Sequence, residues 1–248
     1  MIRKVQSGAK FLLSTIALVS AELLVLFGAF FITLGLLIIV IRQIFFRRQD
    51  ALDHYVFDYL SPYITGTNTA IIQFFTFFGS QQFLIPAFML LLAWYYFIHK
   101  NKWYFIKILI IAISNLLLMF SLKYLFNRPR PLVPLLKEVP GLSFPSGHAF
   151  MGLTFFGLLI YIIYHDVSNK WVKWISIFNL VIFILMVGLS RVYLRVHYAS
   201  DVIGGFCFGI LSLMILLFIL RQIEKFNFRK KLRHLTADEE DKIDTDEN

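Results

Sequence analysis

Residues 103–122 have the sequence WYFIKILIIAISNLLLMFSL, with Lys107 as their single charged side chain. A helix needs about 20 predominantly apolar residues to cross the hydrocarbon core of a bilayer, and this run is long enough. Similar apolar runs occupy the following residues: 20–45, 82–98, 149–164, 172–189 and 200–220. The pattern therefore predicts an all-α, polytopic membrane protein with six transmembrane helices.

The composition of the whole chain agrees with a membrane protein. Of the 248 residues, 58% are hydrophobic and the mean hydropathy is +0.72, whereas apolar residues make up about 45–50% of an ordinary soluble domain. The net charge of +9 would suit a nucleic acid partner, but the basic residues lie mostly between the apolar runs rather than in one stripe. We therefore expect no nucleic acid partner.

The N-terminal segment resembles a signal peptide only in its first residues. Arg3, Lys4 and Lys10 precede an apolar run that is much longer than the roughly 7–15 residues of a signal core, and no small-residue cleavage site closes it. We expect this run to remain as the first span. Glu22 is either a functional carboxylate within the membrane or, as we prefer, the residue at which the span begins after an interfacial segment at 11–21.

The distribution of Lys and Arg predicts the orientation in the membrane. With a cytoplasmic N-terminus, fifteen of these residues fall on the inner side of the predicted spans and nine on the outer side. Because cytoplasmic segments carry an excess of Lys and Arg, we expect both termini in the cytoplasm.

The chain divides into a six-helix membrane domain, residues 1–234, and an acidic cytoplasmic tail, residues 235–248. The tail is polar with almost no apolar content, so we expect it to be disordered and dispensable for catalysis. Residues 47–81 mix charged and aromatic side chains, which predicts helices along the outer membrane surface.

Three polar clusters interrupt the apolar pattern, and under this orientation all three lie on the outer side. The first, KYLFNRPRP at residues 123–131, ends the third span, and its two prolines predict that the helix stops near Asn127. Lys123 as a point charge and Arg130 as a bidentate fork suit an anion with several oxygens. The alternative is a stop-transfer cluster that caps the helix C-terminus.

The second cluster, FPSGH at residues 144–148, directly precedes the fourth span. Proline and serine open a helix well, glycine lets the backbone approach a ligand, and the free amides of the first turn form an anion site. His148 lies at the mouth of that site. Alternatively, it is an amphipathic anchor at the membrane interface.

The third cluster contains Ser190, Arg191, His197 and Asp201. His197 and Asp201 are i and i+4, so they lie on one helix face if the sixth span begins by about residue 196. The carboxylate can then accept the proton of one ring nitrogen and leave the other unprotonated, as a nucleophilic imidazole requires. A purely structural pair is the alternative, although its burial at a membrane edge is costly.

The motifs Lys-x6-Arg-Pro, Pro-Ser-Gly-His and Ser-Arg-x5-His-x3-Asp follow one another between Lys123 and Asp201. In this order they resemble the signature of the type 2 phosphatidic acid phosphatase superfamily. Arg128 competes with Arg130 for the first motif, and only the family spacing from Lys123 selects Arg130. The resemblance implies an integral protein of the cell membrane, in bacteria the inner membrane, with the active site facing the outside or periplasm.

The resemblance also implies a reaction, the hydrolysis of a lipid phosphate or lipid pyrophosphate through a phosphohistidine. His197 would attack phosphorus, Asp201 would orient it, and His148 would protonate the leaving oxygen and then activate water. The residues implied to hold the phosphate oxygens are Lys123, Arg130, Ser146, Gly147 and Arg191. Candidate substrates are phosphatidic acid, phosphatidylglycerol phosphate, undecaprenyl pyrophosphate and a lipid A phosphate, and the motifs cannot rank them because they hold only the phosphate.

We expect no metal ion, no cofactor and no required protein partner. No carboxylate cluster suited to Mg²⁺ accompanies the motifs, since Asp201 is committed to His197. Cys207 is the single cysteine and lies in the last span, which excludes an intrachain disulfide and a cysteine-rich metal site.

Other functions remain open. The chain could transfer phosphate to an alcohol or another lipid, or it could be a lipid-binding membrane protein without turnover. The intact set of His148, His197 and Asp201 argues against the latter. Vanadate-dependent haloperoxidases share a similar oxyanion site but are soluble, so the apolar composition argues against that chemistry.

Overall fold

The computed structural model describes residues 24–47, 50–135 and 140–246, with side chains described as far as residue 229. Within these ranges the chain is helical and contains no strand, which confirms the predicted all-α class. The first span ends with η1 (Arg42–Phe46). It is followed by α2 (Ala51–Leu60), η2 (Ser61–Tyr63), α3 (Gly66–Phe78), α4 (Gln81–Ala93), η3 (Trp94–Ile98), α5 (Lys102–Phe126), α6 (Gly147–Asp166), α7 (Lys170–Tyr193) and α8 (Ala199–Asp246).

Six helices in the described ranges are long and apolar enough to cross a membrane, as predicted. They are Leu24–Phe46, Gln81–Ile98, Lys102–Phe126, Gly147–Asp166, Lys170–Tyr193 and Ala199–Arg229. The first belongs to a separate compact unit, Met1–Asp50, in which it ends with η1. The other five belong to the unit Ala51–Asn248, which also contains the three predicted motifs.

The segment between the first two spans forms the predicted helices, α2 and α3, neither of which is a candidate span. The Thr65 side chain caps α3 by accepting a hydrogen bond from the backbone N–H of Asn68. The placement of these helices on the outer membrane surface stays a prediction. In α2 the carboxylate of Asp53 is buried, whereas Asp58 is exposed.

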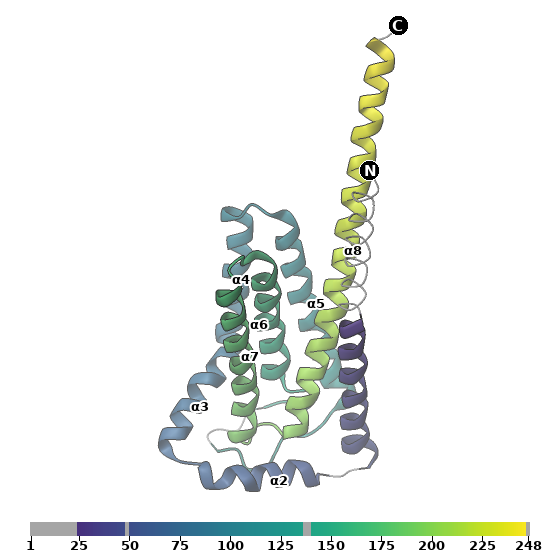
Figure 1. Cartoon of the computed structure of the whole chain (residues 1–248). Helices are drawn as coiled ribbons and strands as arrows, with labels where there is room; N and C mark the ends of the chain where they lie inside the picture. The colour runs from purple at the N-terminus through teal and green to yellow at the C-terminus, as the bar shows by residue number, and fades with distance from the viewer. Residues whose placement is uncertain (1–23, 48–49, 136–139, 247–248) are drawn as a thin grey trace, which may run out of the picture. The chain divides into compact units, whose positions relative to one another are not determined.

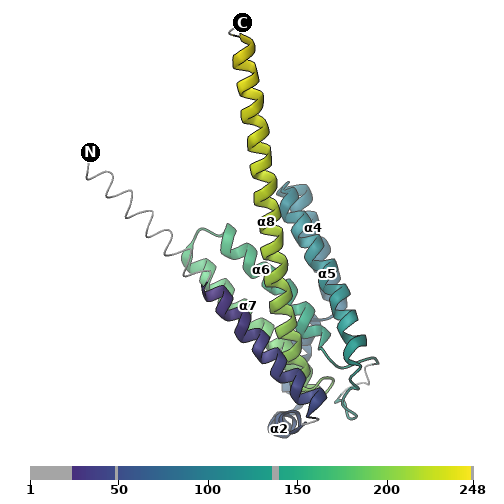
Figure 2. The same cartoon turned by 90° about the vertical axis from the view of Figure 1, so that its right-hand side faces the viewer.

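Helix α6 occupies the centre of the five-span unit, where it contacts α4, α5, α7 and α8 (Figure 1, Figure 2). Its contact with α8 is close because α8 presents glycines to it. A Cβ added to Gly205 would lie 2.9 Å from the backbone oxygen of Ser146, and one added to Gly209 would lie 3.0 Å from the side chain of Leu153. Small residues let helices approach closely in a membrane, and here they hold the start of α8 against the start of α6.

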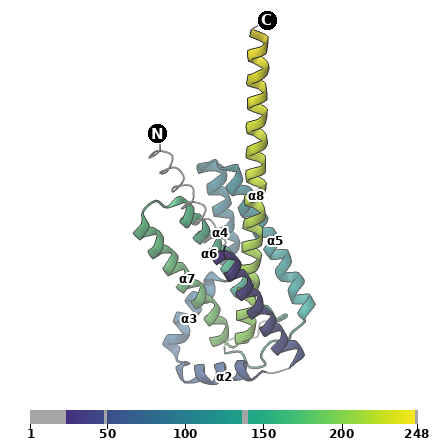
Figure 3. The ribbon, with the colours of Figure 1, turned by 45° about the vertical axis from the view of Figure 1, so that its right-hand side comes forward.

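The ends of four helices meet on one side of this unit. Helix α5 ends at Phe126, next to Asn127, as the prolines of the first cluster predict, and Asn127 has a left-handed conformation with φ 44°. Helix α6 begins after Ser146, α7 ends at Tyr193 and α8 begins at Ala199. Helix α2 contacts α7 and α8 and lies across their ends at the bottom of the view in Figure 3. The three motifs are therefore carried by neighbouring helix ends.

The remaining sequence predictions are about the C-terminal tail and the N-terminal segment. Helix α8 continues to Asp246 and so includes most of the tail, residues 235–248, for which the composition predicts disorder. Glu and Lys favour a helix by intrinsic propensity, so high polarity does not exclude one. The domain boundary at residue 234 stays a prediction. Glu22 and the basic residues ahead of it lie outside the described residues.

Candidate active site

The structure brings the charged residues of the three motifs together at the meeting point of the helix ends. His148 interacts electrostatically with Lys123, Arg130 and Arg191 and with the imidazole of His197. The cations also repel one another, since Arg130 interacts electrostatically with both Lys123 and Arg191. Three cations and the imidazole of His197 thus lie within electrostatic range of His148.

His197 lies in the turn before α8, so the condition that a helix begins by about residue 196 is not met, although His197 and Asp201 still lie beside each other. Helix α8 begins only at Ala199, and His197 Nδ1 lies 3.6 Å from Asp201 Oδ2, which is longer than a hydrogen bond. Ser143 Oγ bridges the two residues: it lies 3.3 Å from His197 Nδ1 and donates to Asp201 Oδ2 at 2.5 Å. The imidazole and the carboxylate are therefore linked through a serine hydroxyl.

The contacts of His197 define which ring nitrogen carries the proton. Arg130 NH1 lies 3.3 Å from His197 Nε2, and because a guanidinium only donates, Nε2 must be the acceptor. The proton then resides on Nδ1, which faces Ser143. Burial and, to a lesser extent, the charges of Arg130 and Arg191 lower the pKa of His197 to about 4 against the opposing effect of Asp201. His197 is therefore neutral at physiological pH, with an unprotonated Nε2 beside a guanidinium.

Asp201 is fixed by the start of its own helix. As a residue of the first turn, it accepts a hydrogen bond at Oδ2 from the backbone N–H of Tyr198 at 2.9 Å, the contact by which an acidic residue caps a helix N-terminus. Its backbone oxygen accepts a hydrogen bond from the N–H of Ser146 at 3.1 Å. The second and third motifs are thus joined directly by a backbone hydrogen bond.

Backbone carbonyls and one hydroxyl orient the three cations of the site. Each cation donates a hydrogen bond to at least one neutral oxygen. This bond positions the cation but does not neutralise its charge. The bonds are Lys123 Nζ to Leu142 O at 2.6 Å, Arg130 Nε to Gly141 O at 3.2 Å, Arg130 NH1 to Val196 O at 3.0 Å and Arg191 NH1 to Thr76 Oγ1 at 2.5 Å. Such fixed cations suit a phosphate.

Among the described residues, three buried side-chain atoms have no hydrogen-bond partner: Ser80 Oγ, Ser146 Oγ and Arg191 Nε. Buried polar atoms are normally paired, so each needs an explanation. Ser146 and Arg191 belong to the predicted phosphate site, where their free donors would bind phosphate oxygens. Ser80 follows Gly79 in the chain, and Gly79 packs on His148: a Cβ added to Gly79 would lie 3.0 Å from Cδ2 of His148.

Arg128 and Arg130 occupy different positions, which separates the two candidates for the first motif. Arg130 contacts His197, whereas Arg128 NH1 donates to Asp201 Oδ1 at 2.6 Å and Arg128 NH2 donates to Asp53 Oδ2 at 2.8 Å. Sequence reasoning missed Asp53 and Ser143. Ser143 stands close to the second motif, but Asp53 belongs to α2 and carries no motif at all.

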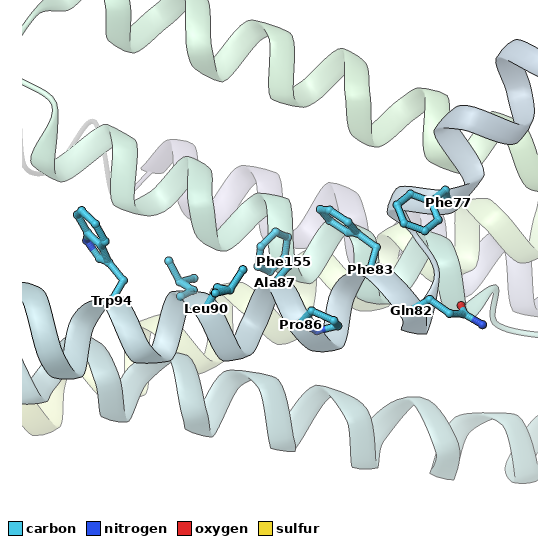
Figure 4. Close-up of a pocket in the computed structure, with 9 residues that line it drawn as sticks. Phe77, Gln82, Phe83, Pro86, Ala87, Leu90, Trp94 and Phe155 are labelled. Atoms are coloured by element: carbon cyan, nitrogen blue, oxygen red, sulfur yellow. The ribbon is translucent and has the colours of Figure 1, made fainter.

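An apolar pocket with a volume of about 440 Å³ runs along α4 (Figure 4). Phe77 from α3 and Phe155 from α6 line it together with Gln82, Phe83, Pro86, Ala87, Leu90, Leu91 and Trp94. Phe77 and Gln82 flank Gly79 in the chain, and Gly79 packs on His148. The pocket therefore has two lining residues that are close in sequence to Gly79.

Comparisons with known proteins identify similar sequences and structures. A family profile described as the PAP2 superfamily matches residues 103–225. Phosphatidylglycerophosphatase B of Bacillus subtilis (strain 168) is 32% identical over 168 residues, which cover 66% of this chain and 79% of that protein.

Two solved structures are also similar. A transmembrane PAP2-type phosphatidylglycerolphosphate phosphatase from Bacillus subtilis matches with a TM-score of 0.69 and 24% identity over 77% of this chain and 96% of its own. Aquifex aeolicus LpxE matches with a TM-score of 0.54 and 25% identity over 67% of this chain and 95% of its own. The first of these likenesses supports the fold.

Proposed function

Because the chain belongs to the PAP2 superfamily and is an integral membrane lipid phosphatase, we propose that it releases phosphate through a phosphohistidine formed at His197. The observation that carries this proposal is the environment of the imidazole. Its Nε2 is an unprotonated acceptor beside Arg130, and its Nδ1 faces Ser143 and, through it, Asp201. This is the arrangement that a nitrogen nucleophile requires.

The first chemical step forms the bond between His197 Nε2 and phosphorus and breaks the bond between phosphorus and the leaving oxygen. His148, when protonated, gives its proton to that oxygen. The proton on His197 Nδ1 stays in place, and the ring becomes a cation that Asp201 stabilises through Ser143. In the second step, the now neutral His148 takes a proton from water, the resulting hydroxide attacks phosphorus, and His197 leaves as a neutral imidazole.

The proposed role of the cations is to stabilise the negative charge on the phosphoryl oxygens. Charge on the non-bridging oxygens is greatest around the transition state, and preorganised donors lower its energy most when they need no rearrangement. We assign this role to the side chains of Lys123, Arg130, Ser146 and Arg191 and the backbone N–H of Gly147. A Cβ added to Gly147 would lie 3.2 Å from the Met119 sulfur, so this backbone is tightly enclosed.

The proposed substrate is phosphatidylglycerol phosphate. Phosphatidylglycerophosphatase B of Bacillus subtilis supports this choice over phosphatidic acid, undecaprenyl pyrophosphate and a lipid A phosphate, because this chain covers most of its length. The test is phosphate release from these four lipids by the detergent-purified protein, with His197→Ala as background. We expect the highest kcat/KM for phosphatidylglycerol phosphate. Another lipid with a higher value would replace it as the substrate, and no release from any of them would overturn the function.

We further propose that the site faces the outer side of the membrane, with both termini in the cytoplasm. The support is the excess of Lys and Arg on the opposite side, fifteen against nine. A lipid in the outer leaflet can then present its headgroup to the helix ends while its chains stay in the bilayer.

The reaction is expected to proceed without a metal ion. Within the described residues, no group of three or more His, Cys, Asp or Glu side chains could hold one. The proposed phosphate site relies on Lys and Arg in the place of Mg²⁺. We expect phosphate release to be unchanged after dialysis against excess chelator. Loss of activity on chelation with recovery on addition of Mg²⁺ would contradict this prediction.

We propose that the apolar pocket along α4 holds an acyl chain of the substrate, since its lining is almost entirely apolar and two of its residues, Phe77 and Gln82, are close in sequence to Gly79, which packs on His148. Replacing Ala87 with phenylalanine fills the pocket and is expected to raise KM for a long-chain lipid phosphate at least about tenfold, as the loss of a few buried methylenes would. A water-soluble phosphate ester should be hydrolysed as by the wild type.

The matched control is Met89→Phe, because Met89 lies on the same helix, is 61% exposed and does not line the pocket. Equal KM values for Ala87→Phe and Met89→Phe with the long-chain lipid would contradict this placement of the chain.

A further inference from the structure

Asp53 is a carboxylate that lies almost completely buried in α2, with 2% of the residue exposed. It belongs to none of the three motifs and lies outside the residues matched by the PAP2 profile. Burial of a charged carboxylate is costly unless partners compensate for its lost hydration, so the position of Asp53 requires an explanation.

The partners of Asp53 lie at the start of α8 and on the loop after α5. Its Oδ1 accepts a hydrogen bond from the backbone N–H of Ser200 at 2.9 Å, and its Oδ2 accepts from Ser200 Oγ at 2.7 Å and from Arg128 NH2 at 2.8 Å. The backbone contact satisfies an N–H of the first turn of α8, as a capping residue does. Asp53 therefore fixes the helix start that carries Asp201.

Arg128 connects Asp53 to Asp201. Its NH1 donates to Asp201 Oδ1 at 2.6 Å and to Ser200 Oγ at 2.8 Å, and its guanidinium carbon lies 4.2 Å from the centre of the Tyr198 ring. Burial alone would lower the pKa of Arg128, but the carboxylates of Asp201 and Asp53 raise it above its usual value, so the group is a cation. Two carboxylates thus share one guanidinium.

The charge balance of this group explains the presence of a second carboxylate. Asp53, Arg128 and Asp201 together carry a formal charge of −1, which becomes zero when His197 turns into a cation during the reaction. Without Asp53, Arg128 and Asp201 would neutralise each other, and less negative charge would remain to stabilise the phosphohistidine.

We propose that Asp53 is a positioning residue of the phosphatase: through Arg128 and Ser200 it orients Asp201 and leaves its charge available to His197. This inference rests on the proposed function. The hydrogen bonds of Asp53 lead to Arg128 and Ser200, the neighbours of Asp201, so we expect Asp53 to act on the chemical step rather than on the binding of phosphate.

The test compares the kinetics of four purified proteins, the wild type, Asp53→Asn, Asp58→Asn and His197→Ala. Asp58 is the matched control, since it lies in the same helix and is exposed. For Asp53→Asn we expect kcat to fall about 10–100-fold, the usual effect of removing an outer partner of a functional side chain. KM and the inhibition constant of inorganic phosphate should stay at the wild-type values.

A double-variant comparison tests the route through Arg128. If Asp53 acts on Asp201 mainly by this route, adding Asp53→Asn to Arg128→Gln should reduce kcat by a much smaller factor than Asp53→Asn does in the wild type, because only the contact with Ser200 is then left to lose. Independent losses that multiply in the double variant would overturn the route.

Each outcome separates this inference from the proposed function. If wild type and His197→Ala release phosphate equally, the proposed function fails. If the wild type is active and His197→Ala is not, the proposed function stands and Asp53→Asn tests the positioning role. That role fails if Asp53→Asn has the wild-type kcat, or if its lower kcat comes with a raised KM and a raised inhibition constant of phosphate.

Should Asp53→Asn not fold, as judged by thermal unfolding in detergent, Asp53→Glu carries the test. This variant keeps the charge and displaces it by one methylene. A lower kcat at wild-type KM supports the role, and an unchanged kcat overturns it.

Discussion

Replacement of His197 by alanine is expected to lower the rate of phosphate release by about 10⁴-fold or more, since the variant has no atom that can bond to phosphorus. The loss should appear in kcat. KM should change little, because Lys123 and Arg191, which we propose bind the phosphate, belong to other helices. The measurement is steady-state phosphate release from phosphatidylglycerol phosphate in detergent.

The matched control for this variant is His165→Ala. His165 is an exposed histidine in the last turn of α6, where its Nδ1 lies 2.9 Å from the backbone oxygen of Tyr161. We expect this variant to retain wild-type kcat. A His197→Ala protein that keeps more than a small fraction of the activity would rule out His197 as the nucleophile.

Replacement of Asp201 by asparagine is expected to lower kcat by about 10³–10⁴-fold, the range seen when a carboxylate that orients a catalytic histidine loses its charge. The amide keeps the size of the side chain but cannot stabilise the imidazole as a cation. The Arg128 ion pair with Asp53 stays in place in this variant. The kinetic signature should be a fall in kcat with little change in KM.

The Asp201 prediction is checked by the same assay, with Asp58→Asn as the control for an Asp to Asn change. A circular dichroism spectrum equal to that of the wild type would show that the helices persist. Wild-type kcat in the Asp201→Asn protein would mean that His197 does not depend on the carboxylate.

Much of the fold was predictable because the signals for it are local. A membrane span needs a long apolar run, and each of the six runs can be read without knowledge of the rest of the chain. The helix ends at Asn127 and Ser146 were also predictable, since proline and serine act on the residues next to them.

The shared helix face of His197 and Asp201 depended on a helix that begins by about residue 196, and the reason why α8 begins later lies partly outside the local sequence. The first turn is capped by Asp201 at the N–H of Tyr198 and by Asp53 at the N–H of Ser200. Asp53 is 147 residues away in the chain, so no periodic pattern reveals this contact. The turn leaves His197 outside the helix and places Ser143 between it and Asp201.

The site residues also divide into those with a local signal in the sequence and those without one. The motifs single out side chains that are unusual in their own surroundings, such as cations and a histidine beside apolar runs. Ser143 and Asp53 look ordinary in the sequence, and their importance comes from contacts across 58 and 147 residues. Only the folded chain reveals them.

The most direct test of the account is to trap the phosphorylated protein during turnover. Wild type and His197→Ala are mixed with a ³²P-labelled lipid phosphate, quenched in alkali within milliseconds and digested, and the labelled peptide is sequenced. We predict acid-labile, alkali-stable label on His197 in the wild type and none in His197→Ala. Turnover by the wild type without label on His197, or equal label in both proteins, would contradict the central claim.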